Sequence, residues 1–145
     1  MGKQNIKVNI EKHREALEKM ALDIWAKPEA GFREFNATKV QQDYLRNMGA
    51  KITSPVDVVE TAFIAEYGSG KPVIALLGEY DALSGLSQKA GQLEPIPRKG
   101  TENGHGCGHC LLGTAAAGAA LMAKDYLIQT GREGTVVLIG CPAEE

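Results

Sequence analysis

LLGTAAAGAALMAKDYLIQTGREGTVVLIG, residues 111–140, sets the fold class of this chain. Its first two thirds predict a long Ala-rich helix over residues 110–130, ended by Gly131. The predicted helix is apolar on nearly every side, so it should be buried against a sheet, with its glycines permitting close approach.

Two continuous apolar runs lie on either side of this helix, PVIALLG at 72–78 and TVVLIG at 135–140. Such runs are typical of strands that helices cover on both faces. Strand, helix and strand follow one another without a hairpin signal, which predicts a parallel α/β unit.

The part of the chain before residue 72 predicts two helices and one more strand. The first helix lies within residues 10–27 and stops at Pro28, and the second follows Asn36 as its N-cap and ends at Gly49. TAFIAEYG, at 61–68, alternates loosely, which indicates a partly exposed strand. Residues 84–104 lack periodicity and form a long connection, a feature that in compact domains is usually functional or disordered.

Composition narrows the function classes. The 145 residues suit one domain, and the net charge of −2 with scattered basic residues argues against binding to nucleic acid. The chain starts without an apolar signal segment, and we expect no membrane span because charges interrupt the longest apolar run. Three cysteines without an export signal argue against a disulfide scaffold, so we expect a cytoplasmic protein.

Polar residues from three separate segments should meet at one edge of the sheet. Residues 79–81, EYD, follow the first apolar strand, and residues 144–145, EE, follow the second. GHGCGH, at 104–109, immediately precedes the helix that connects them. In open parallel sheets ligands bind beyond the carboxyl ends of the strands, so these segments predict a functional site there.

The residue types at this edge suit a divalent metal ion. Cys107 and His109 are two residues apart, so an extended backbone points both side chains the same way. Thiolate, imidazole and carboxylate are all ligands for zinc and similar ions. Of the adjacent Glu144 and Glu145, one can bind the ion while the other removes a proton from a water that the ion activates. Asp81 is better placed to hydrogen-bond an imidazole ligand.

A second interpretation uses the same residues differently. Cys107-Gly108-His109-Cys110 has the letters of a disulfide isomerase active site, and a cysteine at a helix N-terminus has a lowered pKa. Those enzymes carry an aromatic-Trp run before the first cysteine and place the motif directly after a strand, whereas a long loop precedes it here. Thiol–disulfide exchange is therefore the less favoured alternative.

Three stretches in this order carry a family resemblance: LGEYDALSGLSQ (77–88), NGHGCGHCLLGTAAAGAA (103–120) and PAEE (142–145). Together they resemble the di-metal aminoacylase/carboxypeptidase superfamily of amidohydrolases, in the branch of indole-acetyl-amino-acid and p-aminobenzoyl-glutamate hydrolases. KPEAGFREF, at 27–35, is similar to that branch's P-E-x-G-F-x-E stretch. The resemblance implies the N-terminal part of a mainly parallel-sheet, helix-flanked metallopeptidase catalytic domain.

The resemblance also implies a role for each site residue. Cys107 would bridge two divalent ions, zinc or manganese, with His109 and Glu145 as further ligands. Glu144 would be the general base, and Asp81 the aspartate that supports a ligand.

Two positions depart from the pattern of the relatives. Glu79 stands where relatives have His or Asp, and Cys110 stands where they usually have Asp or Asn. The resemblance assigns neither residue a role.

Relatives act on N-acyl amino acids, aminobenzoyl-glutamate or small dipeptides, so a small amide is the implied substrate and a homo-oligomer is expected of the full-length enzyme. They continue past the Glu-Glu pair with further histidine ligands and an inserted dimerisation domain. We therefore expect residues 1–145 to be the N-terminal segment of the catalytic domain, inactive alone. The alternatives are a truncated remnant, or a split chain that needs a second half.

Overall fold

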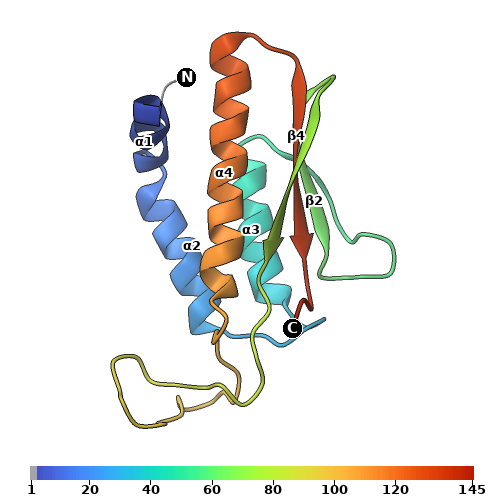
Figure 1. The fold of residues 1–145 in the computed structure, drawn as a ribbon. Coiled ribbons are helices and arrows are strands. Elements are labelled where there is room, and N and C mark those ends of the chain that lie inside the picture. Colours follow the sequence, from blue (N-terminus) through green and yellow to red (C-terminus); the bar gives the residue numbers. More distant parts are fainter. Residues whose placement is uncertain (1–2) are drawn as a thin grey trace.

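The computed structural model describes residues 3–145, which form a four-stranded sheet with helices packed on one of its faces (Figure 1). The central unit consists of β3 (Val73–Glu79), α4 (His109–Thr130) and β4 (Gly134–Cys141). β3 and β4 pair in parallel, in a register that runs from Val73 opposite Thr135 to Glu79 opposite Cys141. The predicted parallel α/β unit is therefore confirmed.

The sheet that the described residues form is mixed. Its strand order is β1-β2-β4-β3, with β1 (Lys51–Thr53) and β2 (Phe63–Ser69) each in antiparallel pairs. Only a short turn connects β2 to β3. Such a turn reverses the direction of the chain, whereas two parallel strands would need a crossover connection of a dozen or more residues. The two strands thus run in opposite directions on either side of β4.

Three helices precede or flank the first strands: α1 (Lys3–Glu11), α2 (Arg14–Ala26) and α3 (Phe35–Asn47). The predicted N-cap of α3 is wrong, because Asn36 lies inside the helix. Instead the carboxylate of Glu29 accepts the backbone N–H groups of Asn36 and Ala37 at 2.9–3.0 Å. An acidic side chain there satisfies free N–H groups and favours the positive end of the helix dipole.

α4 lies against both strands of the parallel pair, and its other side packs on α2. A Cβ added at Gly113 would lie 2.5 Å from the carbonyl oxygen of Glu79. The absence of a side chain at Gly113 therefore lets α4 approach the end of β3 closely, as the glycines of the sequence predicted. The core between the layers includes fully buried side chains from α2, α3, α4 and the sheet: Ile24, Leu45, Phe63, Leu121 and Leu138.

The other face of the sheet is open within the described residues. Val73 and Leu77 of β3 are 60% and 63% exposed, although a continuous apolar strand predicted cover on both faces. That prediction is wrong for this part of the chain because α2, α3 and α4 all lie on one side (Figure 1).

α4 is also the one helix of the described residues that is long and apolar enough to span a membrane by length and composition. A central helix of an α/β unit has the same composition because it is buried on several sides. In this structure part of the apolar surface of α4 is buried by contacts with α2, β3 and β4.

The connection from β3 to α4 projects from one end of the molecule (Figure 1). A bridge between Leu83 and Gly104 closes it at its base. Further out, the guanidinium of Arg98 donates to the carbonyl oxygens of Trp25 and Ala26 at 2.9 and 3.0 Å and lies 4.4 Å from the centre of the Trp25 ring. The loop is thus attached to the last turn of α2.

Candidate metal centre

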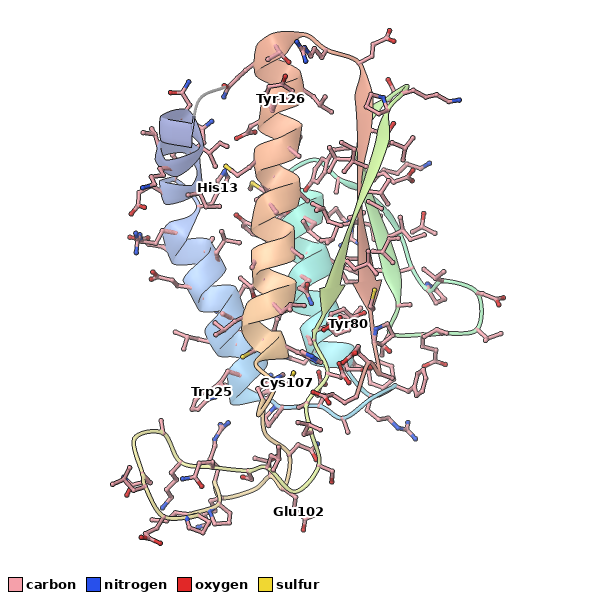
Figure 2. The ribbon with its side chains drawn as sticks, viewed as in Figure 1. His13, Trp25, Tyr80, Glu102, Cys107 and Tyr126 are labelled. Carbon is pink, nitrogen blue, oxygen red and sulfur yellow. The ribbon has the colours of Figure 1, made fainter. Side chains whose placement is uncertain are left out.

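The carboxyl ends of β3 and β4 and the start of α4 meet at one end of the molecule. Figure 2 labels Cys107, just before the start of α4, and Tyr80, just after the end of β3. Parallel pairing forces this arrangement, because it places Glu79 directly opposite Cys141 and brings the segment after each strand to the same edge. All five predicted site residues lie at this edge.

His109 and Asp81 form the buried base of the site, each 2% exposed. His109 Nδ1 lies 2.9 Å from Asp81 Oδ1, so the imidazole N–H donates to the carboxylate. Asp81 Oδ2 accepts the backbone N–H of Glu145 at 3.0 Å. Asp81 therefore fixes both the imidazole ring and the backbone of the Glu-Glu segment, and it leaves His109 Nε2 free to face the cluster.

Three more carboxylates surround His109 Nε2. Glu79 Oε2 is 3.1 Å from this nitrogen, Glu144 Oε2 is 3.7 Å away and Glu145 Oε1 is 3.8 Å away. The donor atoms of Cys107, His109 and Glu145 lie within 4.8 Å of one another, and so do those of Glu79, His109 and Glu144. The cysteine, the histidine and the terminal glutamate thus come together as the sequence predicted.

The charge of this cluster fits a divalent cation. Among the described residues, the carboxylates of Glu79, Asp81, Glu144 and Glu145 form ion pairs only with His109, and no Lys or Arg is paired with them. One imidazole carries at most a single positive charge, so the cluster keeps a net negative charge that a divalent ion would neutralise. Thiolate, imidazole and carboxylate are all donors that divalent metal ions bind in proteins.

Both cysteines of the CGHC stretch have thiol pKa values that are raised by their surroundings. The pKa of the Cys107 thiol is raised, first by its hydrogen bond to Glu145 and further by burial and the neighbouring carboxylates. Burial in the core raises the pKa of Cys110 as well. Thiol–disulfide exchange proceeds through the thiolate, which a lowered pKa would favour. A metal ion, in contrast, binds the thiolate and displaces the proton.

The structure also shows where Glu79 and His105 lie relative to the cluster. Glu79, to which the sequence assigned no role, has the carboxylate oxygen closest to His109 Nε2. Its spacing of two residues from Asp81 was the available signal, because alternate residues of an extended segment point the same way. His105 lies outside both donor sets: its Nε2 is 3.3 Å from the carbonyl oxygen of Ile24, and burial lowers its pKa.

Comparison with known proteins confirms the resemblance seen in the motifs. No protein-family model matches the chain. The chain is 51% identical over 136 residues to one of the subunits of p-aminobenzoyl-glutamate hydrolase from Escherichia coli (strain K12), covering 94% of this chain and 28% of that protein. It is 36% identical over 126 residues to an IAA-amino acid hydrolase of Arabidopsis thaliana, covering 84% of this chain and 27% of that protein.

A solved structure supports the same relationship. A dinuclear metal-binding peptidase of the M20 family from Bacillus subtilis superposes with a TM-score of 0.75 at 28% identity, over 92% of this chain and 36% of that one. The chain therefore has the fold of part of a metallopeptidase and is related in sequence to amidohydrolases. It spans about three tenths of the length of the curated relatives it matches.

Proposed function

We propose that this chain supplies the metal-binding and water-activating part of a metal-dependent amidohydrolase. The substrate would be a small amide: an N-acyl amino acid, aminobenzoyl-glutamate or a dipeptide. One observation carries the proposal: Cys107, His109 and Glu145 present three different metal-binding groups within 4.8 Å of one another, beside a further free carboxylate. The names of the sequence relatives indicate which bond is cleaved.

In this proposal Cys107, His109 and Glu145 are the ligands. Asp81 holds the His109 ring by its Nδ1 and the Glu145 backbone by its N–H, so two of the three ligands are oriented before an ion binds. Such support raises metal affinity because less conformational freedom is lost on binding.

Glu144 is the proposed general base. Its side chain is half exposed and its Oε2 lies 3.7 Å from His109 Nε2, beside the ligands. The bound ions would polarise the amide carbonyl and lower the pKa of the attacking water. Glu144 takes a proton from that water as the oxygen bonds to the carbonyl carbon, and it delivers the proton to the amide nitrogen as the C–N bond breaks. The products are a carboxylate and an amine.

The three proposed ligands, Cys107, His109 and Glu145, are too few to hold two ions. We therefore propose that the remaining ligands, and the surfaces that select the substrate, lie in a longer polypeptide or a partner chain. The segment would then be the N-terminal part of the catalytic domain of a cytoplasmic homo-oligomeric enzyme. The Escherichia coli relative is named as one subunit of its hydrolase, which supports assembly with other chains.

The test is to express the whole open reading frame that contains residues 1–145 and to measure metal content and amide hydrolysis together. Bound zinc and manganese are quantified by mass spectrometry. Turnover is measured on p-aminobenzoyl-glutamate, indole-acetyl-amino acids and a dipeptide panel, before and after chelation. We expect one to two ions per chain, and loss of turnover on chelation that either ion restores.

Cys110→Ser is the matched control for Cys107→Ser. Under the proposed function Cys107→Ser removes bound metal, whereas Cys110→Ser, in the core, leaves the ligand set intact. Loss of insulin reduction in both variants, without bound metal in the wild type, would establish thiol–disulfide exchange instead. A stop codon directly after Glu145, with neither metal nor turnover even when neighbouring gene products are added, would identify a remnant.

A further inference from the structure

Glu34 is a fully buried carboxylate that the proposed chemistry does not use. It lies at the start of α3, far from Glu144 in the sequence. Among the described residues no Lys or Arg forms an ion pair with it, and its two oxygens are bound by neutral donors. Oε2 accepts the hydroxyl of Thr61 at 2.8 Å, and Oε1 accepts the backbone N–H of Ala143 at 2.8 Å. A buried carboxylate is costly unless such bonds satisfy it, so these two contacts account for its stability there.

The contact with Ala143 acts on the segment that carries the proposed base. Ala143 has a φ of +54°, in the left-handed region that residues with a side chain adopt rarely, and it immediately precedes Glu144. A conformation of this kind persists where the surroundings hold it. Glu34 binds the N–H on one side of Glu144, and Asp81 binds the N–H of Glu145 on the other side.

Gly31, in the segment before α3, also packs against Ala143. A Cβ added there would lie 2.9 Å from the Cβ of Ala143 and 3.1 Å from its Cα. The segment that contains Gly31 and Glu34 therefore packs directly on the backbone of Ala143, with space for a hydrogen atom only.

We propose that Glu34 is a positioning residue for Glu144: its buried carboxylate holds the Ala143 amide and thereby directs the Glu144 side chain toward the His109 cluster. This inference rests on the proposed function of Glu144. The two carboxylate oxygens have different roles in this proposal. The bond from Thr61 to Oε2 stabilises the fold, and the bond from Ala143 to Oε1 sets the geometry of the site.

The variants separate these two bonds. Glu34→Ala removes both, and Glu34→Gln keeps an oxygen for the Ala143 N–H. Thr61→Val removes only the structural bond. Gly31→Ala displaces Ala143 and leaves the carboxylate in place. All four are made in the full-length metal-loaded enzyme, and hydrogen exchange of the backbone amides of residues 143–145 is followed in the metal-free form.

Glu34→Ala should lower kcat about 10- to 100-fold, since a displacement of about 1 Å at a reacting group has an effect of this size. KM and the affinity for zinc should stay within about threefold, because Asp81 still holds Glu145. Exchange of the Ala143 amide should become faster. Glu34→Gln should restore most of the turnover and the slow exchange, and Gly31→Ala should lower kcat in the same way as Glu34→Ala. Thr61→Val should lower the Tm and leave kcat and exchange at Ala143 unchanged.

A purely structural role would give a different pattern. In that case Glu34→Ala and Thr61→Val would lower the Tm alike, with kcat per folded molecule unchanged in both, and the inference would be overturned. If Glu34→Ala does not fold, Gly31→Ala and Glu34→Gln decide by the same measurements. A wild-type enzyme without amide hydrolysis overturns the proposed function and the positioning role together. Unchanged exchange at Ala143 in Glu34→Ala overturns the positioning role alone.

Discussion

The middle and the carboxyl end of the β3–β4 pair share one register of seven paired residues. They differ in their side chains, which are apolar in the middle and charged at the end. In the middle Leu76 lies opposite Leu138, and Leu138 is fully buried under α4. At the end Glu79 lies opposite Cys141, and Glu79 together with three carboxylates from the segments after both strands surrounds one imidazole. The middle stabilises the fold by burying apolar surface, whereas the end places like charges close together, where they repel one another unless a cation neutralises them.

The comparison teaches that stability and chemistry are separable along one strand pair. Substitutions at the carboxyl end should remove function and spare the fold, and substitutions in the middle should do the reverse. Four experiments test this division.

The largest effect is expected from Glu144→Gln in the full-length enzyme. Without a base the kcat should fall about 10²- to 10⁴-fold, and bound metal should be retained because Glu144 is not a proposed ligand. The free energy of unfolding should change by less than about 0.5 kcal/mol, since the side chain is half exposed. Glu133→Gln, just before the opposite end of β4, is the matched control and should leave turnover unchanged. Turnover within threefold of the wild type in Glu144→Gln would refute the assignment of the base.

Leu138→Ala tests the middle of the pair. It should lower the free energy of unfolding by about 2–5 kcal/mol, because it leaves a cavity under α4, and urea titration measures the loss. Val73→Ala is the control at an exposed position of β3 and should cost less than about 1 kcal/mol. The folded fraction of Leu138→Ala should still bind metal. Loss of metal from folded molecules would show that the middle and the end are coupled.

Asp81→Asn tests whether the proposed metal ligands need the hydrogen bonds that Asp81 makes to them. An asparagine replaces a carboxylate that binds both the His109 ring and the Glu145 N–H, so the affinity for zinc should fall about 10- to 100-fold. Competition with a chromophoric chelator measures it. Asp23→Asn, on the surface of α2, is the control. An affinity equal to that of the wild type would mean that the ligands need no support from Asp81.

The smallest effect concerns the Cys107 thiol in the metal-free protein. Because its pKa is raised, chiefly by Glu145, the thiolate fraction at pH 7 is below that of an ordinary cysteine and rises with pH. Alkylation of Cys107 should therefore be slow at neutral pH and accelerate as the pH increases. Glu145→Gln removes the largest cause and should speed alkylation at a given pH. Buried Cys110, followed by peptide mapping, is the internal control. Fast alkylation at neutral pH would instead favour the exchange chemistry of the CGHC letters.

Local patterns were sufficient to predict the framework of this chain. The apolar runs, the Ala-rich helix and Gly131 predicted β3, α4 and β4, because strands and helices differ in the period of their apolar residues. The rule for parallel strands then predicted that residues after β3 and β4 meet near the start of α4. Cys107, His109, Asp81, Glu144 and Glu145 lie there, although their chemical roles remain predictions.

Other features depend on packing between elements, and local patterns gave at most a partial signal for them. The mixed sheet depends on β4 entering between β2 and β3, which neither strand's own sequence specifies. The position of Glu79 closest to His109 Nε2 depends on the depth at which α4 packs on β3 beside Gly113.

The sequence by itself determined which segments form strands and helices and which chemical groups stand at their ends, because these follow from side-chain periodicity and from residue type. Only the tertiary structure decided which face of the sheet is covered, which carboxylate faces the imidazole, and that Glu34 binds the amide of Ala143, 109 residues away. Such contacts depend on how whole elements pack, and packing is settled by the fit of many side chains at once rather than by any short stretch of sequence.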